Sequence, residues 1–151
     1  MGLHHGHALG PDRGGIDGDI AGADELSVER CERRARALGY HGLEVVNLFA
    51  LRSTDPAALY AHEDPVGPLN DDAIEAATAG GKTAVICAWG NHGGISGRAA
   101  RVLRWLRMHG RTVGCLGVNK TGHPVHPLYV PYARALQPVS GDCDFEPWVM
   151  P

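Results

Sequence analysis

Apolar residues recur at helical spacing in two stretches of the chain. In residues 27–38 they lie three or four positions apart, with the arginines mostly away from the apolar stripe, which predicts an amphipathic helix closed by Gly39. Residues 98–109 repeat this pattern and end at Gly110. The apolar face of the second helix is opposite four arginines that we expect in solvent: Arg98, Arg101, Arg104 and Arg107.

Three other runs are too apolar for surface strands. Residues 43–51, 83–89 and 112–118 are short and rich in apolar and β-branched side chains, which predicts inner strands of a sheet. A helix that Asn70 or Asp71 caps is predicted to run to residue 79. Connections of more than about a dozen residues favour parallel pairing through right-handed crossovers. We therefore predict an α/β fold, a three-layer sandwich whose small, mainly parallel sheet has three to four strands.

The length indicates one domain. A chain of 151 residues with 44% hydrophobic and 21% charged residues is large enough to bury one ordinary core. Residues 1–22 show no apolar period, so we expect a flexible N-terminal tail there. A single α/β domain is predicted for residues 23–137, followed by a C-terminal tail at 138–151.

The cysteines and the length of the apolar runs indicate in which cellular compartment the protein resides. No run approaches the roughly 20 apolar residues of a membrane span, and the N-terminus lacks a signal pattern. The chain has four cysteines, which lie far apart: Cys31, Cys87, Cys115 and Cys143. We therefore expect reduced thiols with a core role, in a cytoplasmic protein without membrane contact. No Cys/His set has zinc spacing, so we expect no metal and no other cofactor.

The formal net charge of -3 hides an asymmetry along the chain. Residues 1–80 contain 14 acidic and 6 basic side chains, a balance of -8, whereas residues 81–151 contain 3 acidic and 8 basic ones, a balance of +5. A basic second half is compatible with phosphate or nucleic-acid partners. It is equally compatible with two oppositely charged parts that help the halves dock.

Ligands of open α/β sheets collect beyond the carboxyl ends of the strands, which draws attention to the loop after residue 118. This loop reads NKTGHPVHPLYVP, and a proline after each of His123 and His126 restricts both to extended backbone. An imidazole can donate a proton or stabilise an oxyanion near neutral pH, so both histidines are candidate catalytic residues. The alternative is that they bond to backbone groups and only hold the loop. Asn119, Lys120 and Tyr129 are candidate ligand contacts.

We expect the loop after residue 89 to form a second wall of the ligand site. Its glycines at 93 and 94 would let the backbone approach a ligand or cradle an anion, but it lacks the established nucleotide-binding patterns, and a plain turn is the alternative. In the first predicted strand, Asn47 is a polar residue that we expect to be buried, where it either orients a loop or contacts a ligand. The candidates from the second wall are Trp89, Gly90, Asn91 and His92.

Several motifs together resemble a bacterial and phage family, domain of unknown function 1643, over residues 24–131. They are GYHGLEVVNLFALRSTDPAAL at 39–59, DPVGPLND at 64–71, AWGNHG at 88–93 and CLGVNKTGHPVHPLYVP at 115–131. The family pattern usually opens with a strand and a Leu-Asn-Pro-Ser loop, followed by an acidic stretch and a helix. Residues 23–31 are similar to the acidic stretch and helix, and nothing upstream resembles the opening loop. The resemblance therefore implies a site that lacks one wall.

The order of motifs is more remotely similar to uracil-DNA glycosylases, whose His-Pro loop faces a flipped base and stabilises charge on it. This resemblance implies that role for His123 or His126 and a base-reading role for Asn47. The basic second half of the chain further favours phosphate contacts for Lys120 and Arg98. We therefore predict an enzyme that recognises a nucleobase or nucleotide, free or in nucleic acid, and hydrolyses an N-glycosidic bond. The alternative is a non-catalytic ligand- or nucleic-acid-binding module, a degenerate or truncated family member.

Overall fold

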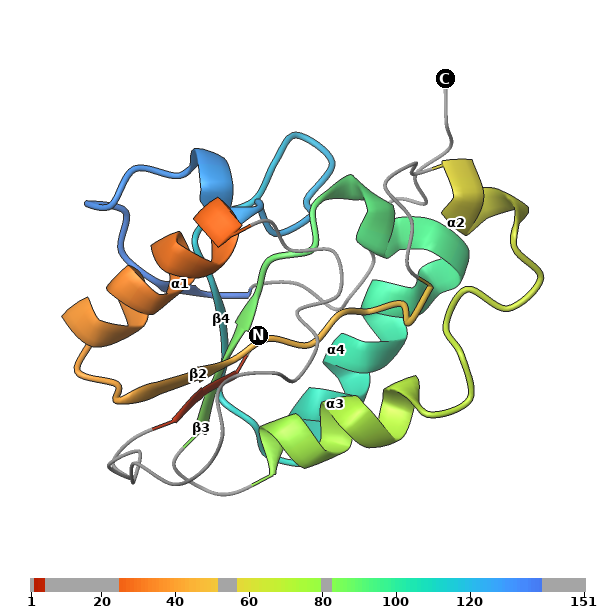
Figure 1. Cartoon of the computed structure of the whole chain (residues 1–151), viewed down its shortest axis with the longest axis horizontal. Coiled ribbons are helices and arrows are strands. Elements are labelled where there is room, and N and C mark those ends of the chain that lie inside the picture. The colour runs from red at the N-terminus through yellow and green to blue at the C-terminus, as the bar shows by residue number, and fades with distance from the viewer. Residues whose placement is uncertain (1, 5–24, 52–56, 80–82, 140–151) are drawn as a thin grey trace.

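One mixed sheet organises the protein. The computed structural model describes residues 2–4, 25–51, 57–79 and 83–139, and within these ranges five strands are ordered β2-β1-β3-β4-β5 (Figure 1). The strands are β1 (Gly2–His4), β2 (Gly42–Glu44), β3 (Thr83–Cys87), β4 (Val113–Cys115) and β5 (Gln137–Pro138).

The strand directions differ from the predicted ones. β3 and β4 are parallel, with Cys87 opposite Cys115, whereas the pairs β1–β2, β1–β3 and β4–β5 are antiparallel. The α/β class is confirmed, but the prediction of a mainly parallel sheet is wrong. It fails because β1 and β5 come from segments without an apolar pattern, and both pair antiparallel with their neighbours.

The apolar run at residues 43–51 forms much less strand than predicted. β2 ends at Glu44 and lies at the edge of the sheet, and residues 45–51 continue without regular structure. The backbone N–H groups of Ala50 and Leu51 donate to the carbonyls of Val66 and Pro65, so the segment pairs with a loop instead of a strand. A short apolar run satisfies the pattern of a buried strand and that of an irregular core segment equally well.

Helices contact both faces of the sheet. α1 (Glu25–Ala37), α3 (Asn70–Thr78) and α4 (Arg98–Met108) confirm the three predicted helices, and α2 (Ala57–Ala61) adds a short turn. Successive β3 side chains point to opposite faces: Ile86 packs with Ala35 of α1, whereas Val85 packs with α3 and α4. Figure 1 shows α1 on one side of the strands and the other two long helices on the opposite side.

Parts of both predicted tails belong to the sheet. Residues 2–4 form β1, although their segment has no apolar period. Pro138 lies in β5, and Val139 is 6% exposed in a core cluster with Leu103 and Cys115. The remainder of the two tail predictions, residues 5–22 and 140–151, lies outside the described residues.

The guanidinium of Arg98 is buried, not solvated as predicted, with a residue exposure of 1%. Its Nε donates to the carbonyl of Leu48 at 2.9 Å, one Nη donates to Oδ1 of Asn70 at 2.7 Å, and the other pairs with Asp71 at 2.5 Å. Asn70 in turn donates through Nδ2 to the carbonyl of Asn47 at 3.1 Å. Arg98 thereby ties α4 to α3 and to the irregular segment 45–51.

This network also changes the start of α3. The N-cap position is Leu69 and no side chain caps it, so the predicted cap by Asn70 or Asp71 is wrong. The other α4 arginines follow the helical pattern more closely: Arg101 and Arg104 are exposed, and half-buried Arg107 donates to the carbonyl of Val139 at 2.6 Å.

Replacing Arg98 by Met, which keeps an apolar stem, should lower the free energy of unfolding by about 3 kcal/mol, because Leu48 and Asn70 lose a charged donor. Urea denaturation followed by circular dichroism measures this change. The control is Arg104→Met on the exposed side of the same helix, which should stay within about 0.5 kcal/mol of the wild type. Equal losses in the two variants would contradict a special role of Arg98.

Candidate functional site

A cavity of about 290 Å³ opens between α1, the irregular segment 45–51 and the end of β3. Its walls are mostly apolar, and Val46, Leu48 and Phe49 supply one side. The opposite side consists of Val28 and Cys31 of α1. The polar side chains of the lining are Ser27, Asn47, Thr78, His92 and His126.

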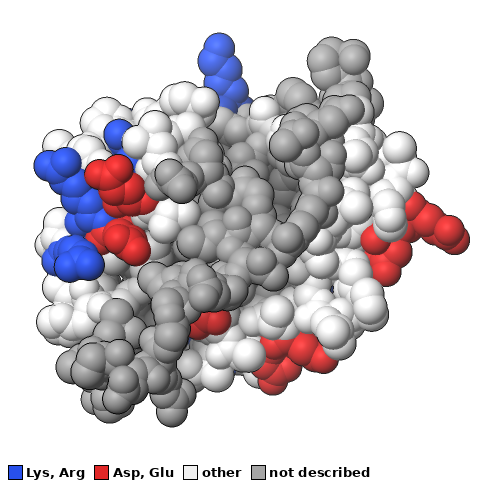
Figure 2. All heavy atoms as spheres, in the orientation of Figure 1, with Lys and Arg blue, Asp and Glu red and all other residues white. Residues whose placement is uncertain are grey.

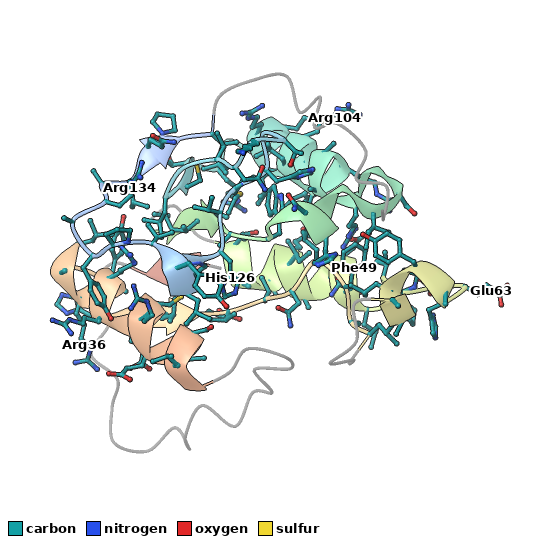
Figure 3. The ribbon with its side chains drawn as sticks, turned by 90° about the horizontal axis from the view of Figure 1, so that it is seen from above. Arg36, Phe49, Glu63, Arg104, His126 and Arg134 are labelled. Atoms are coloured by element: carbon teal, nitrogen blue, oxygen red, sulfur yellow. The ribbon has the colours of Figure 1, made fainter. Side chains whose placement is uncertain are left out.

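The cavity brings together four of the ten residues predicted for the site: Asn47, Trp89, His92 and His126. They come from three separate segments, and the two loops after β3 and β4 meet because these strands are parallel and end at the same edge of the sheet. Figure 3 shows His126 on the α1 side of the molecule and Phe49 on the side of α2. Asn47 is exposed at this cavity, not buried in a strand as expected.

His123 does not reach the cavity lining. It is 0% exposed, its backbone N–H donates to Oδ1 of Asn119 at 2.9 Å, and its carbonyl accepts from the backbone N–H of Asn119 at 2.9 Å. Both bonds are made by the main chain of His123, so they hold the turn without involving its imidazole.

The side-chain amides of Asn119 and Asn91 form hydrogen bonds around the same turn. Oδ1 of Asn119 also accepts from the backbone N–H of Thr121 at 3.0 Å, and its Nδ2 donates to Oδ1 of Asn91 at 2.5 Å. The hydroxyl of Thr121 lies 2.8 Å from one amide oxygen and 3.0 Å from the other. Both amides therefore build the loop. Lys120 and Tyr129 are exposed and lie outside the cavity lining.

The glycines of the loop after β3 serve packing. A Cβ on Gly93 would lie 2.2 Å from Cδ1 of Trp89, so only glycine fits beneath the indole ring. Gly93 and Gly94 are buried, which leaves the predicted anion cradle without an open backbone surface. Gly90 is outside the lining, and its N–H donates to the carbonyl of Pro124 at 2.8 Å, which joins this loop to the His-Pro loop.

His126 is the exposed imidazole of the cavity rim. Its Nδ1 accepts from the backbone N–H of Leu128 at 3.3 Å, at the start of the short 3-10 helix η2 (Pro127–Tyr129). An Nδ1 that accepts carries no proton, so the neutral ring is protonated at Nε2. His92 contributes a second imidazole, whose Nδ1 lies 3.4 Å from the hydroxyl of Tyr60 on α2.

Arginines of α1 dock the segment that carries His126. Arg34 is 7% exposed and donates to the carbonyls of Val130, of Pro131 at 2.9 Å and of Tyr132 at 3.4 Å. Arg30 donates to Val130 at 2.7 Å. Burial and then the nearby charge of Arg30 lower the pKa of Arg34. The helical pattern gave no signal for these contacts, because it places the arginines off the apolar stripe.

The described residues lack several groups that would point to other kinds of site. No carboxylate lines the cavity within these ranges, and no three His, Cys, Asp or Glu side chains are grouped there to hold a metal ion. Within the same part of the chain, every helix is too short or too polar to cross a membrane.

The family model described as protein of unknown function, DUF1643, matches residues 19–128. The chain belongs to the DUF1643 family. The family resemblance seen in the motifs is thereby confirmed. The DUF1643 match includes α1, the segment 45–51 and both loops of the cavity. No curated protein and no solved structure matches the chain.

Asn119→Ala should lower the free energy of unfolding by about 2 kcal/mol and speed amide hydrogen exchange at residues 121 and 123, because it removes the shared acceptor of the turn. Hydrogen exchange by mass spectrometry and urea denaturation measure the two effects. The adjacent exposed Lys120 is the control, and Lys120→Ala should change neither. Unaltered hydrogen exchange in Asn119→Ala would show that the Asn119 side chain does not hold the turn.

Cys31 should react slowly in the folded protein, because burial raises the pKa of its thiol. We expect its alkylation by iodoacetamide at pH 8.5 to be at least about tenfold slower than that of a short cysteine peptide. Mass spectrometry of the peptide that contains Cys31 gives the rate. In concentrated urea the difference should vanish, and a native rate equal to that of the peptide would contradict the described burial.

Proposed function

We propose that the cavity binds a nucleobase and that the protein hydrolyses the N-glycosidic bond of a nucleoside, nucleotide or nucleic acid. The observation that carries the proposal is the meeting of Asn47, His92 and His126 on one mostly apolar cavity. The volume of about 290 Å³ is at the lower end of small-molecule pockets, roughly 300–1,000 Å³, which favours a single ring system over a dinucleotide.

Each polar group has a role in this proposal. The exposed amide of Asn47 offers both a donor and an acceptor, which suits the edge of a base. His126, protonated at Nε2 when neutral, donates to the base as the bond to the sugar breaks and the electron pair moves to the base nitrogen. Water adds to the sugar carbon, with His92 as the second imidazole available to accept its proton.

The proposal extends to the architecture and the compartment. We take the fold as a three-layer sandwich of uracil-DNA-glycosylase type, which the helices on both faces of the sheet support. The catalytic role implied for the His-Pro loop is assigned to His126, since His123 is buried. A bacterial cytoplasm suits the three buried free cysteines of the described chain.

A non-catalytic binding module is the second candidate. The observation that favours it is a cavity lining without a carboxylate in the described residues, which leaves activation of water to imidazole alone. In that case the same contacts bind a base or nucleotide without turnover.

The test measures release of free base from uracil-containing DNA and from a panel of nucleotides. His126→Ala should reduce the rate about 100-fold or more, because a positioned general acid contributes roughly 10²–10⁴. The control is His41→Ala, an exposed histidine between α1 and β2, which should retain the wild-type rate.

Wild-type activity in His126→Ala would refute the assigned site. If the wild type releases no base but calorimetry detects binding that Asn47→Ala abolishes, the binding module is the correct function.

A further inference from the structure

Three guanidinium groups of α1 surround one aromatic ring. The Cζ atoms of Arg30, Arg33 and Arg34 lie 4.6, 4.5 and 5.1 Å from the ring centroid of Tyr132. The ring is 41% exposed, so this cluster, which we call the Tyr132 cluster, opens to solvent. Three like charges around one ring repel each other, and cation–π attraction offsets only part of that cost.

The three arginines are not equivalent. Arg34 is buried and its donors serve backbone carbonyls, and Arg30 donates to Pro127 and Val130. Arg33 is exposed, and within the described residues its recorded contact is the ring of Tyr132 alone. Its forked set of donors is therefore available to an oxygen-rich anion.

We propose that Arg33, with Arg30 beside it, binds a phosphoryl group at the Tyr132 cluster. A phosphoryl group matches the guanidinium fork with two parallel bonds and places negative charge where the like charges meet. Burial and then the charge of Arg30 lower the pKa of Arg34, in line with like charges that lie close together at this cluster.

The cluster adjoins the cavity through neighbouring residues that belong to the cavity lining. Arg30 donates to the carbonyl of Pro127, which lines the cavity, and the neighbouring Cys31 lines it too. This proposal extends the proposed function and depends on it for the position of the base. The cavity holds the base, and the cluster holds a phosphate of the same ligand. Tyr129, 85% exposed on η2, is available to stack on a following base if that ligand is a strand.

The surface charge limits the size of this site. Figure 2 shows basic side chains gathered over α1 with acidic ones directly beside them, and other acidic groups toward the far end of the molecule. On this face the basic surface over α1 is small and flanked by acidic groups, which suits one phosphoryl group better than a long backbone. It lies in the half of the sequence with an excess of acidic residues, so the overall charge asymmetry did not reveal it.

The experiment compares inorganic phosphate, deoxyuridine and deoxyuridine monophosphate by calorimetry, and a fluorescein-labelled single-stranded dU 12-mer by anisotropy. Arg33→Gln should weaken binding of a phosphorylated ligand about tenfold and leave deoxyuridine unchanged. Arg33→Lys, which keeps the charge but not the fork, should recover part of the loss. Arg104→Gln is the control, since Arg104 is exposed and lies far from Arg36 of α1 in Figure 3.

Comparison of the phosphorylated ligands identifies the source of the phosphate. A loss confined to the 12-mer, with a salt slope reduced by about 0.7, assigns it to a strand, whereas a loss confined to the monophosphate assigns it to a free nucleotide. If inorganic phosphate binds through Arg33 while deoxyuridine does not bind, the cluster stands and the proposed base site fails. Wild-type affinity of Arg33→Gln for both phosphorylated ligands, or an equal loss in Arg104→Gln, overturns the proposal.

Discussion

The bonds from the Arg98 guanidinium hold the wall of the cavity that has no regular structure. Residues 45–51 are not part of the sheet, so their partly buried carbonyls need donors from elsewhere in the protein. Arg98 supplies one directly to Leu48, and Asn70, itself held by Arg98, supplies another to Asn47. An arginine at the start of a helix is unfavourable toward the helix dipole, and here the carboxylate of Asp71 offsets that cost.

The segment next to the cavity rim at His126 is held in the same way. Arg34 donates to consecutive carbonyls of the segment after η2, which positions that short helix and His126 before it. Arginines from helices thus hold two irregular segments, the wall at residues 45–51 and the segment that follows the rim residues His126 and Pro127. The backbone that carries the imidazole of His126 and the amide of Asn47 is thereby fixed.

The sequence predicted the helices well because their apolar residues share one face for several turns, as in α1 and α4. It failed for residues 43–51, whose apolar run does not distinguish a strand from an irregular wall, and for β1 and β5, which are too short to carry a pattern. Four candidate site residues meet because parallel strands end at one edge. His123, Asn91 and Asn119 do not, because a polar residue in a loop gives no sign of whether a turn has already used it.

The contacts of Arg34 join parts of the chain that are far apart in sequence, since Val130 lies 96 positions after it. Contacts of this separation form late, since the entropy of closing so long a loop must be overcome first. The part between α3 and β4 depends on nearer neighbours and can assemble earlier. During synthesis, α1 therefore waits for the segment around Tyr132 to leave the ribosome before its buried guanidinium finds its acceptors. The cavity, which needs both, is among the last features of the protein to form.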